Sequence, residues 1–311
     1  MSNGLPLAVY IHVPKTGGTS VNETVKDLDP FGIEHIERFI GVNLNYIDEW
    51  NSQILAKRLN WISGHVSFDE VAQCLIWQNK HVEYFGTVRE PISQLISHVN
   101  FIITQASVDF IPQYNTAEYF RNVDIRSTNF QDPYDVIHML TRYSDFLLNN
   151  QARTILGKDF FKLSEIDIAR RIERYSMIST EYNVSDVISC MGYDFRKAKK
   201  TFPELNRATY AFDKSIFYEY PLASFLKTYH RYDMIMYNII QSIDFPSDSG
   251  RRQRPMYTSE GEFTLENFSE QEYLFSCPDV EWAINQGAMS SALDHFKNFG
   301  RHEGRRRIVE I

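Results

Sequence analysis

The chain has 311 residues, 43% of them apolar and 14% aromatic, which is enough for one sizeable α/β core and a small appendage. A formal net charge of −8 argues against a nucleic-acid binder held by bulk electrostatics, and mildly against a long polyanionic partner. Three widely separated cysteines form no CxxC pair, so neither a disulfide framework nor a zinc site is expected.

No apolar run approaches the roughly 20 residues that a membrane-spanning helix needs. The first residues also lack a basic segment followed by a long apolar stretch, the pattern of a secretory signal. A cytoplasmic protein without a transmembrane segment is therefore expected.

The first predicted element is a strand over 5–13, a continuous apolar run that Pro14 ends and that is typical of a buried parallel strand. A helix is expected from about 19 to 28. Further strands are expected over 61–65, 82–88 and 176–179, with helices from Pro91 and over 133–149, 184–191 and 215–243. This alternation predicts an α/β fold, a P-loop-like parallel sheet flanked by helices.

Three regions are expected: a main domain over 1–246, a linker over 247–263 and a small helical module over 264–311. The linker begins with a polar stretch that contains glycine and proline. The module resembles a short appendage of bacterial enzymes that build or modify glycans. Its basic run, Arg305 to Arg307, is either a solvated tail or a weak contact with an anionic acceptor or a membrane surface.

The strongest local pattern directly follows the first strand: Lys15, Thr16, Gly17, Gly18, Thr19 and Ser20. Paired glycines allow a tight turn that gathers backbone N–H groups, and the helix N-terminus that follows favours negative charge. The pattern predicts a cradle for a terminal phosphate. It is not the triphosphatase loop GxxxxGK[ST], because here the lysine precedes the glycines.

The end of the 82–88 strand is either a second phosphate anchor or a strand end where an arginine pairs with an acid and a serine faces solvent. Arg89 closes that strand, Pro91 suits the first turn of a helix, and Ser97 follows two helical turns later. Two phosphate sites at two strand ends suit a nucleotide with a phosphate at each end of an adenosine.

The segment 11–20 resembles the 5′-phosphosulfate loop of carbohydrate sulfotransferases, in particular the branch containing the heparan sulfate 2-O-sulfotransferases. The segment 87–91 with Ser97 resembles the 3′-phosphate motif of the same family. The resemblance implies that PAPS (3′-phosphoadenosine 5′-phosphosulfate) is the donor and that Lys15 lies near its bridging oxygen. The segment 150–153 resembles a further family motif with altered spacing, so Arg153 either approaches the nucleotide or acceptor or belongs to a polar helix end.

A histidine is the expected general base, since a neutral imidazole can take a hydroxyl proton near pH 7. His65 follows the 61–65 strand, and the resemblance implies the same role for it. His98, next to Ser97, is a second candidate, and His12 is expected to be a core residue. No histidine pair has metal-ligand spacing, so no catalytic metal is expected.

The sequence therefore predicts sulfuryl transfer from PAPS to a hydroxyl of a carbohydrate or glycan, with release of PAP. The alternatives are a nucleotide-binding protein without turnover and, less favoured, a kinase that uses ATP. Trp50, Trp61, Tyr114 and Tyr119 either stack on sugar rings or pack in the core.

Overall fold

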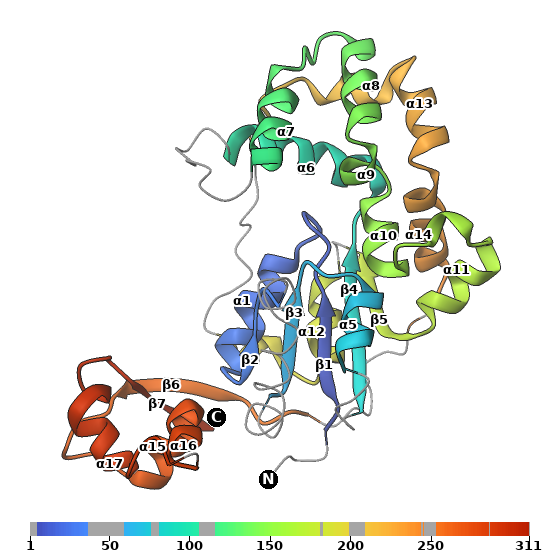
Figure 1. Cartoon of the computed structure of the whole chain (residues 1–311). Coiled ribbons are helices and arrows are strands. Elements are labelled where there is room, and N and C mark those ends of the chain that lie inside the picture. Colours follow the sequence, from blue (N-terminus) through green and yellow to red (C-terminus); the bar gives the residue numbers. More distant parts are fainter. Residues whose placement is uncertain are drawn as a thin grey trace.

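The computed structural model describes residues 5–36, 59–75, 81–105, 116–180, 183–198, 209–243, 245, 253–285 and 287–310. They form a five-stranded parallel sheet with helices on both faces, a helical lobe beyond one sheet edge, and a small module beside the sheet domain (Figure 1). The predicted α/β class, with a parallel sheet flanked by helices, is confirmed.

The strands of the sheet are β1 (Leu7–Ile11), β2 (Gly32–Ile33), β3 (Trp61–Gly64), β4 (Val82–Val88) and β5 (Tyr175–Thr180), in the order β2-β3-β1-β4-β5. Their pairings are parallel, so their carboxyl ends share one edge. The chain places β3 on one side of β1 and β4 on the other. The end of β1 is therefore a topological switch point, the position where open α/β sheets bind ligands.

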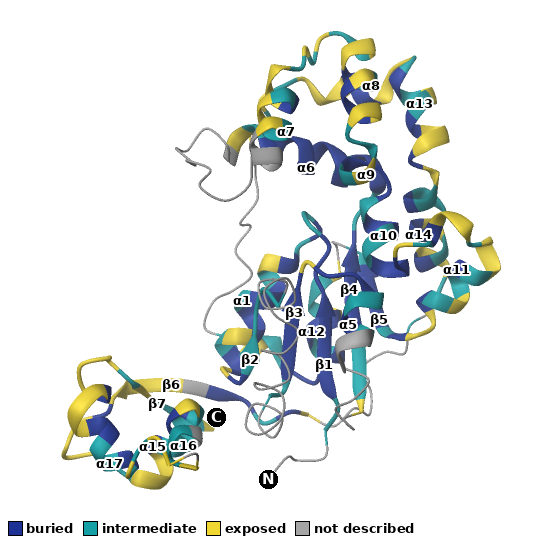
Figure 2. Ribbon diagram, viewed as in Figure 1, coloured by how far each residue is buried: buried dark blue, intermediate teal, exposed yellow. Residues whose placement is uncertain are grey.

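Side chains of β1 alternate between two apolar cores. Leu7, Val9 and Ile11 pack toward one face of the sheet, whereas Ala8 and Tyr10 pack toward the other. The first face is covered by α5 (Phe68–Leu75), α10 (Asn150–Leu156), η2 (Phe160–Lys162), α11 (Glu165–Ile172) and α14 (Arg231–Ser242). The second is covered by α1 (Gly18–Leu28), α12 (Val184–Cys190) and η3 (Phe195–Lys197). The sheet between them is buried (Figure 2).

The helical lobe has a core of its own and stands beyond the carboxyl ends of the strands (Figure 1). It consists of α6 (Pro91–Gln105), α7 (Thr116–Ser127), α8 (Pro133–Arg142), α9 (Ser144–Leu147), η4 (Lys214–Tyr218) and α13 (Leu222–Tyr229). The helix predicted over 133–149 is two helices, and the one predicted over 215–243 is three segments. Tyr143 (φ −113°, ψ 30°) separates α8 from α9. The extended backbone of Glu219 ends η4, and His230 separates α13 from α14.

The C-terminal module combines the helices α15 (Glu270–Ser276), α16 (Pro278–Asn285) and α17 (Ala292–His295) and a π-helical turn over Phe296–Gly300 with an antiparallel pair, β6 (Tyr257–Glu262) and β7 (Arg306–Glu310). The structure refines two expectations about this region. Strand β6 occupies the end of the expected linker, whose residues 247–252 lie outside the described part of the chain. The basic run is not a solvated tail, because it leads into β7.

Two arginines of that run are held by acidic side chains of the module. Arg305 forms ion pairs with Asp279 (2.8 Å) and Glu303 (2.7 Å), and Arg307 pairs with Glu272 (3.0 Å). These contacts use charge that a membrane surface or an anionic acceptor would need. No helix among the described residues is long and apolar enough to cross a membrane.

Arg254 anchors the start of the module on the sheet domain. Its buried guanidinium donates hydrogen bonds to the carbonyls of Met191 (2.5 Å), Pro6 (2.5 Å) and Asn60 (3.2 Å). A further contact is the edge-on packing of Phe31 against Tyr257, with ring centroids 5.1 Å apart. This stretch is therefore bound to the sheet domain rather than solvated along its length.

Candidate functional site

The loop after β1 is the centre of the site. Lys15 (φ 67°) and Gly17 (φ 92°) both have left-handed backbones, and Gly17 caps α1. Thr19 is exposed and Ser20 half-buried in the first turn of α1, so their hydroxyl groups suit an anion at this helix end. The geometry agrees with a phosphate cradle at the switch point of the sheet.

Thr16 has a structural role within this loop. Its buried hydroxyl donates to the Val13 carbonyl (2.9 Å) and lies 3.0 Å from the Thr87 hydroxyl, which in turn lies 2.6 Å from the Tyr10 hydroxyl. These bonds join the loop to β4. The Thr16 side chain is thus satisfied inside the protein, and only its backbone remains for a phosphate.

Position 18 requires a glycine because the His12 ring lies close to it, not because of an unusual backbone conformation. A Cβ atom at position 18 would lie 2.0 Å from Cδ2 of the His12 ring. His12 lies on the same face of the strand as Ala8 and Tyr10, which is the face that α1 covers. The start of α1 can approach only because residue 18 has no side chain.

His12 also belongs to the wall of the site, and its assignment to the core alone was incomplete. Its ring is buried yet packs against the ring of His65, with centroids 4.1 Å apart. The ring of His35 lies 6.0 Å from that of His65 on another side. The strand alternation could have indicated this, since it places residue 12 at the end of the face toward α1.

His65 is exposed at the end of β3, where the sequence placed it. Its Nδ1 lies 2.8 Å from the carbonyl oxygen of His12. A carbonyl only accepts hydrogen bonds, so Nδ1 carries the proton and the lone pair of the neutral ring is on Nε2. Behind it, the Ser63 hydroxyl donates to the Asn22 side chain (2.7 Å) and ties β3 to α1. The backbone thus sets the tautomer that a general base requires.

His98 lies close enough to Lys15 and His65 to interact with their charges, but its ring is buried. Burial, followed by the charges of Arg121, Lys15 and His65, lowers the pKa of His98 to about 4. Its ring packs against Phe146, with centroids 5.1 Å apart, and its Nδ1 is buried without a partner among the described residues. Because a ring that resists protonation is a poor proton acceptor, this environment favours His65 as the base.

His12 is neutral for similar reasons. Burial, followed by the charges of His65, His35 and Lys15, lowers its pKa to about 3. Among the described residues its Nδ1 also has no hydrogen-bond partner. Neutral imidazoles therefore flank the loop on two sides.

Arg89 follows β4, and its backbone is fixed by a side chain from α10. The Gln151 amide accepts a hydrogen bond from the Arg89 N–H (2.8 Å) and donates one to the Arg89 carbonyl (2.9 Å). Gln94 in α6 donates to the Pro14 carbonyl (2.8 Å), which connects the same region to the loop.

Glu90 caps α6 by accepting from the N–H of Ser93 (2.7 Å). Ser97, the other predicted contact to the 3′-phosphate, is buried on α6.

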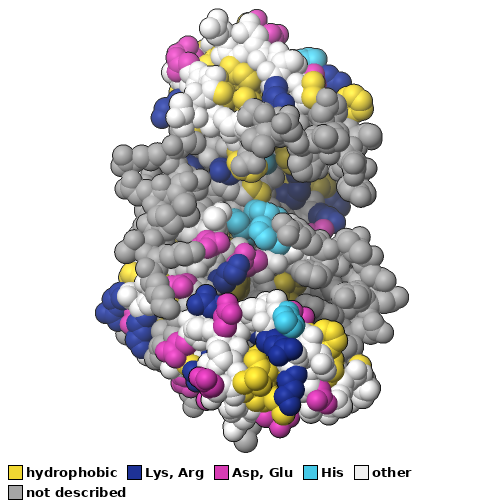
Figure 3. All heavy atoms as spheres, turned by 90° about the vertical axis from the view of Figure 1, so that its left-hand side faces the viewer, with side chains coloured by type: hydrophobic (Ala, Val, Ile, Leu, Met, Phe, Trp, Pro, Cys, Tyr) yellow, Lys and Arg dark blue, Asp and Glu magenta, His cyan; other side chains and the backbone are white. Residues whose placement is uncertain are grey.

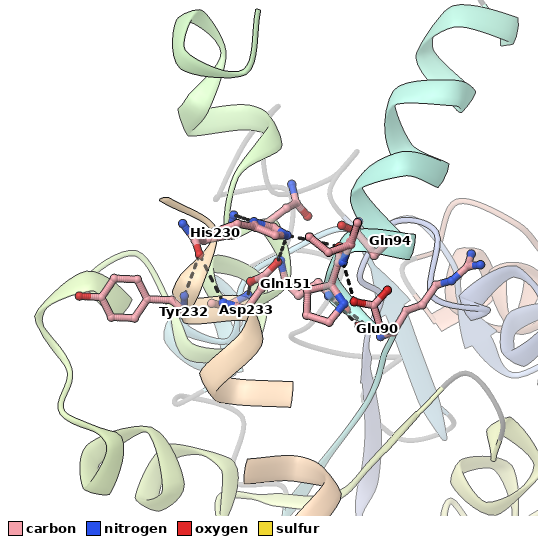
Figure 4. A network of polar contacts seen from close by, with 12 residues as sticks. Glu90, Gln94, Gln151, His230, Tyr232 and Asp233 are labelled. Atoms are coloured by element: carbon pink, nitrogen blue, oxygen red, sulfur yellow. Dashed lines mark hydrogen bonds and ion pairs between the residues drawn. The ribbon is translucent and has the colours of Figure 1, made fainter. Parts of the chain in front are cut away.

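Gln151 is itself held by a buried network from α14 (Figure 4). Asp233 accepts hydrogen bonds from the N–H groups of Gln151 (3.3 Å) and Ala152 (2.6 Å). His230 accepts from the Asn149 N–H (2.9 Å) on Nδ1, so its Nε2 carries the proton that faces the Pro91 carbonyl (3.3 Å). Sequence reasoning missed this network, because nothing in the 215–243 segment marks these side chains as partners of Arg89.

Arg153, in α10, packs against the ring of Phe160. Its guanidinium is 5.7 Å from the ring centroid of Phe160, and burial lowers its pKa against the opposing charges of Asp145 and Asp233. Within the segment 150–153, Gln151 is the residue that hydrogen-bonds to Arg89. A contact of Arg153 with the nucleotide or the acceptor stays a prediction.

Of the predicted aromatic candidates for sugar stacking, Trp61 is a core residue. Its ring is buried and its N–H donates to the Asp29 carbonyl (2.8 Å). Trp50, Tyr114 and the side chain of Tyr119 lie outside the described part of the chain.

The face of the molecule next to this site is hollowed between the lobe and the sheet domain (Figure 3). Histidine side chains gather in the hollow, and lysine or arginine side chains lie beside them. Where side chains are described, no three His, Cys, Asp or Glu residues are grouped to hold a metal ion, and the absence of a metal stays a prediction. The hollow is thus lined by imidazole and cationic groups, which suit an anionic ligand.

Comparison with known proteins gives no family for this chain. No protein-family model matches the sequence, and no curated protein matches it. The site itself is therefore the basis for a functional assignment.

Proposed function

We propose that this protein is a PAPS-dependent O-sulfotransferase that transfers a sulfuryl group to a hydroxyl of a carbohydrate or glycan and releases PAP. One observation carries the proposal: two cationic anchors, Lys15 and Arg89, follow neighbouring parallel strands at the switch point. They are close enough that the charge of Arg89 helps to lower the pKa of Lys15, after the effect of burial. Such a pair suits a ligand that carries more than one phosphate.

In the proposed complex each end of the nucleotide has its own anchor. The backbone of 16–18, the hydroxyls of Thr19 and Ser20, and Lys15 would hold the 5′-phosphate at the N-terminus of α1. Arg89 and Ser97 would hold the 3′-phosphate, for which the forked guanidinium is well suited. The parallel pairing of β1 and β4 supports this assignment, because the two anchors follow the carboxyl ends of neighbouring strands.

The proposed reaction uses His65 as the general base. Its Nε2 takes the proton from the acceptor hydroxyl while that oxygen forms a bond to sulfur. The bond from sulfur to the bridging oxygen breaks, its electron pair remains on the 5′-phosphate, and PAP leaves. Lys15 neutralises the charge that develops on this leaving phosphate. The fixed tautomer of His65 supports this role, because Nε2 is the nitrogen with the lone pair.

Calorimetry with PAP and with ATP tests the proposal, on the native chain and on Arg89→Ala. We expect micromolar PAP binding that far exceeds ATP binding and is lost in Arg89→Ala. Arg126→Ala, an exposed arginine on α7, is the charge-matched control and should bind PAP like the native chain. Equal or preferred ATP binding would overturn the proposal in favour of a kinase.

A further inference from the structure

One face of α6 holds two consecutive residues of the phosphate loop. Gln94, His98 and Phe101 lie four and then three residues apart, a spacing that places them on one side of a helix. Gln94 donates a hydrogen bond to the Pro14 carbonyl (2.8 Å). Seven residues later, the ring centroid of Phe101 lies 4.6 Å from Nζ of Lys15. The backbone at Pro14 and the ammonium group of Lys15 are thus both set by this helix.

The surroundings of the Lys15 ammonium otherwise disfavour its charge. Burial and then the positive charge of Arg89, at the end of β4, lower the pKa of Lys15. Among the described residues, His12 at the end of β1 and His98 on α6 also interact with Lys15, and the lowered pKa of each histidine keeps its ring neutral at pH 7. The negative face of an aromatic ring stabilises a cation without introducing a carboxylate that would repel a phosphate.

We propose that Phe101 is a positioning residue for Lys15: its ring face keeps the lysine ammonium charged and directed at the phosphate cradle. The ring is 40% exposed, so its position is not explained by core packing alone. This inference rests on the proposed function only for the identity of the anion that binds beside Lys15, which is the 5′-phosphate of PAPS.

Replacement of Phe101 by phenylalanines of increasing fluorination tests this inference. Fluorine withdraws electron density from the ring face and weakens a cation–π contact, while the size and packing of the side chain change little. The direct readout is the rate at which an amine-acylating reagent labels Lys15 at pH 8, measured by mass spectrometry of the Lys15 peptide. The second readout is calorimetric binding of inorganic phosphate and of PAP.

We expect labelling of Lys15 to rise stepwise with fluorination, by about 2- to 5-fold in total, as expected for a partly exposed cation–π contact. Binding of inorganic phosphate should weaken over the same series. The same substitutions at Phe299, which is 49% exposed in the C-terminal module, are the control and should leave both readouts unchanged.

Labelling and phosphate binding that are constant across the Phe101 series would overturn the inference. The same experiments test the proposed function independently of the role of Phe101. A stepwise labelling series in a protein that binds inorganic phosphate but not PAP would support the role of Phe101 and refute PAPS as the donor.

Discussion

The side-chain amide of Gln151 accepts a hydrogen bond from the Arg89 N–H (2.8 Å) and donates one to the Arg89 carbonyl (2.9 Å), across 62 positions of the sequence. A single side-chain amide thereby fixes the backbone of Arg89, between β4 and α6. The backbone of Arg89 sets where its guanidinium group can point. The proposed 3′-phosphate site therefore depends on Gln151, although Gln151 need not touch the nucleotide.

Gln151→Glu should weaken PAP binding by about tenfold, because the carboxylate cannot donate to the Arg89 carbonyl and an unsatisfied buried group costs about 1–3 kcal/mol. Calorimetry with PAP measures the effect. Binding of inorganic phosphate at the loop should change little, which separates a local effect from unfolding. Thr154→Ala on the same helix is the control, and equal PAP affinity of Gln151→Glu and the native chain would refute the role of Gln151.

Gly18→Ala should destabilise the protein by about 1–3 kcal/mol, the usual cost of overpacking, since the added Cβ meets the His12 ring. Removing that ring should relieve the clash. We therefore expect the double variant Gly18→Ala/His12→Ala to be more stable than the sum of the two single effects predicts. Urea unfolding of the four proteins gives the coupling, and strict additivity would show that His12 is not the obstacle.

Acid should destabilise the folded chain through His98. Its ordinary pKa is 6.5 and its folded pKa is about 4, so between these values the unfolded chain binds a proton that the folded chain does not. The contribution of His98 to the free energy of unfolding is fully present above about pH 6.5 and is lost as the pH drops toward 4. By pH 5 each such histidine lowers the free energy of unfolding by about 2 kcal/mol. His12 acts in the same direction.

Urea unfolding of the native chain and of His98→Leu between pH 7 and pH 5 tests this linkage. The free energy of unfolding of the variant should fall less steeply, by about the contribution of one histidine. Parallel curves for the two proteins would contradict a neutral buried His98.

His65→Asn separates an enzyme from a protein that only binds a nucleotide. The Asn amide can still donate to the His12 carbonyl, but it has no basic nitrogen. We expect transfer from PAPS to fall at least about 100-fold, the usual contribution of a general base, while PAP affinity stays within about twofold. His65→Ala, which also loses the hydrogen bond, is the companion variant. If His65→Asn retains full transfer, His65 is not the base.

The parallel sheet and the two strand ends that carry Lys15 and Arg89 could be predicted from the sequence alone. These follow from local rules: a buried apolar run, a glycine pair directly after it, and a proline that begins the next helix. The strands β6 and β7 were not predicted. Their pairing joins residues about 50 positions apart, and no local pattern encodes such a partner.

The contacts that hold the two anchors and the environment of each histidine could be seen only in the folded chain. His12 and His65 meet because β1 and β3 are neighbours, and the carbonyl of one then sets the tautomer of the other. The low pKa of His98 comes from burial between α6 and its neighbours in the lobe, and Gln151 reaches Arg89 from a distant helix. Burial, tautomer and long-range hydrogen bonding depend on what surrounds a side chain in space, which the order of residues along the chain does not state.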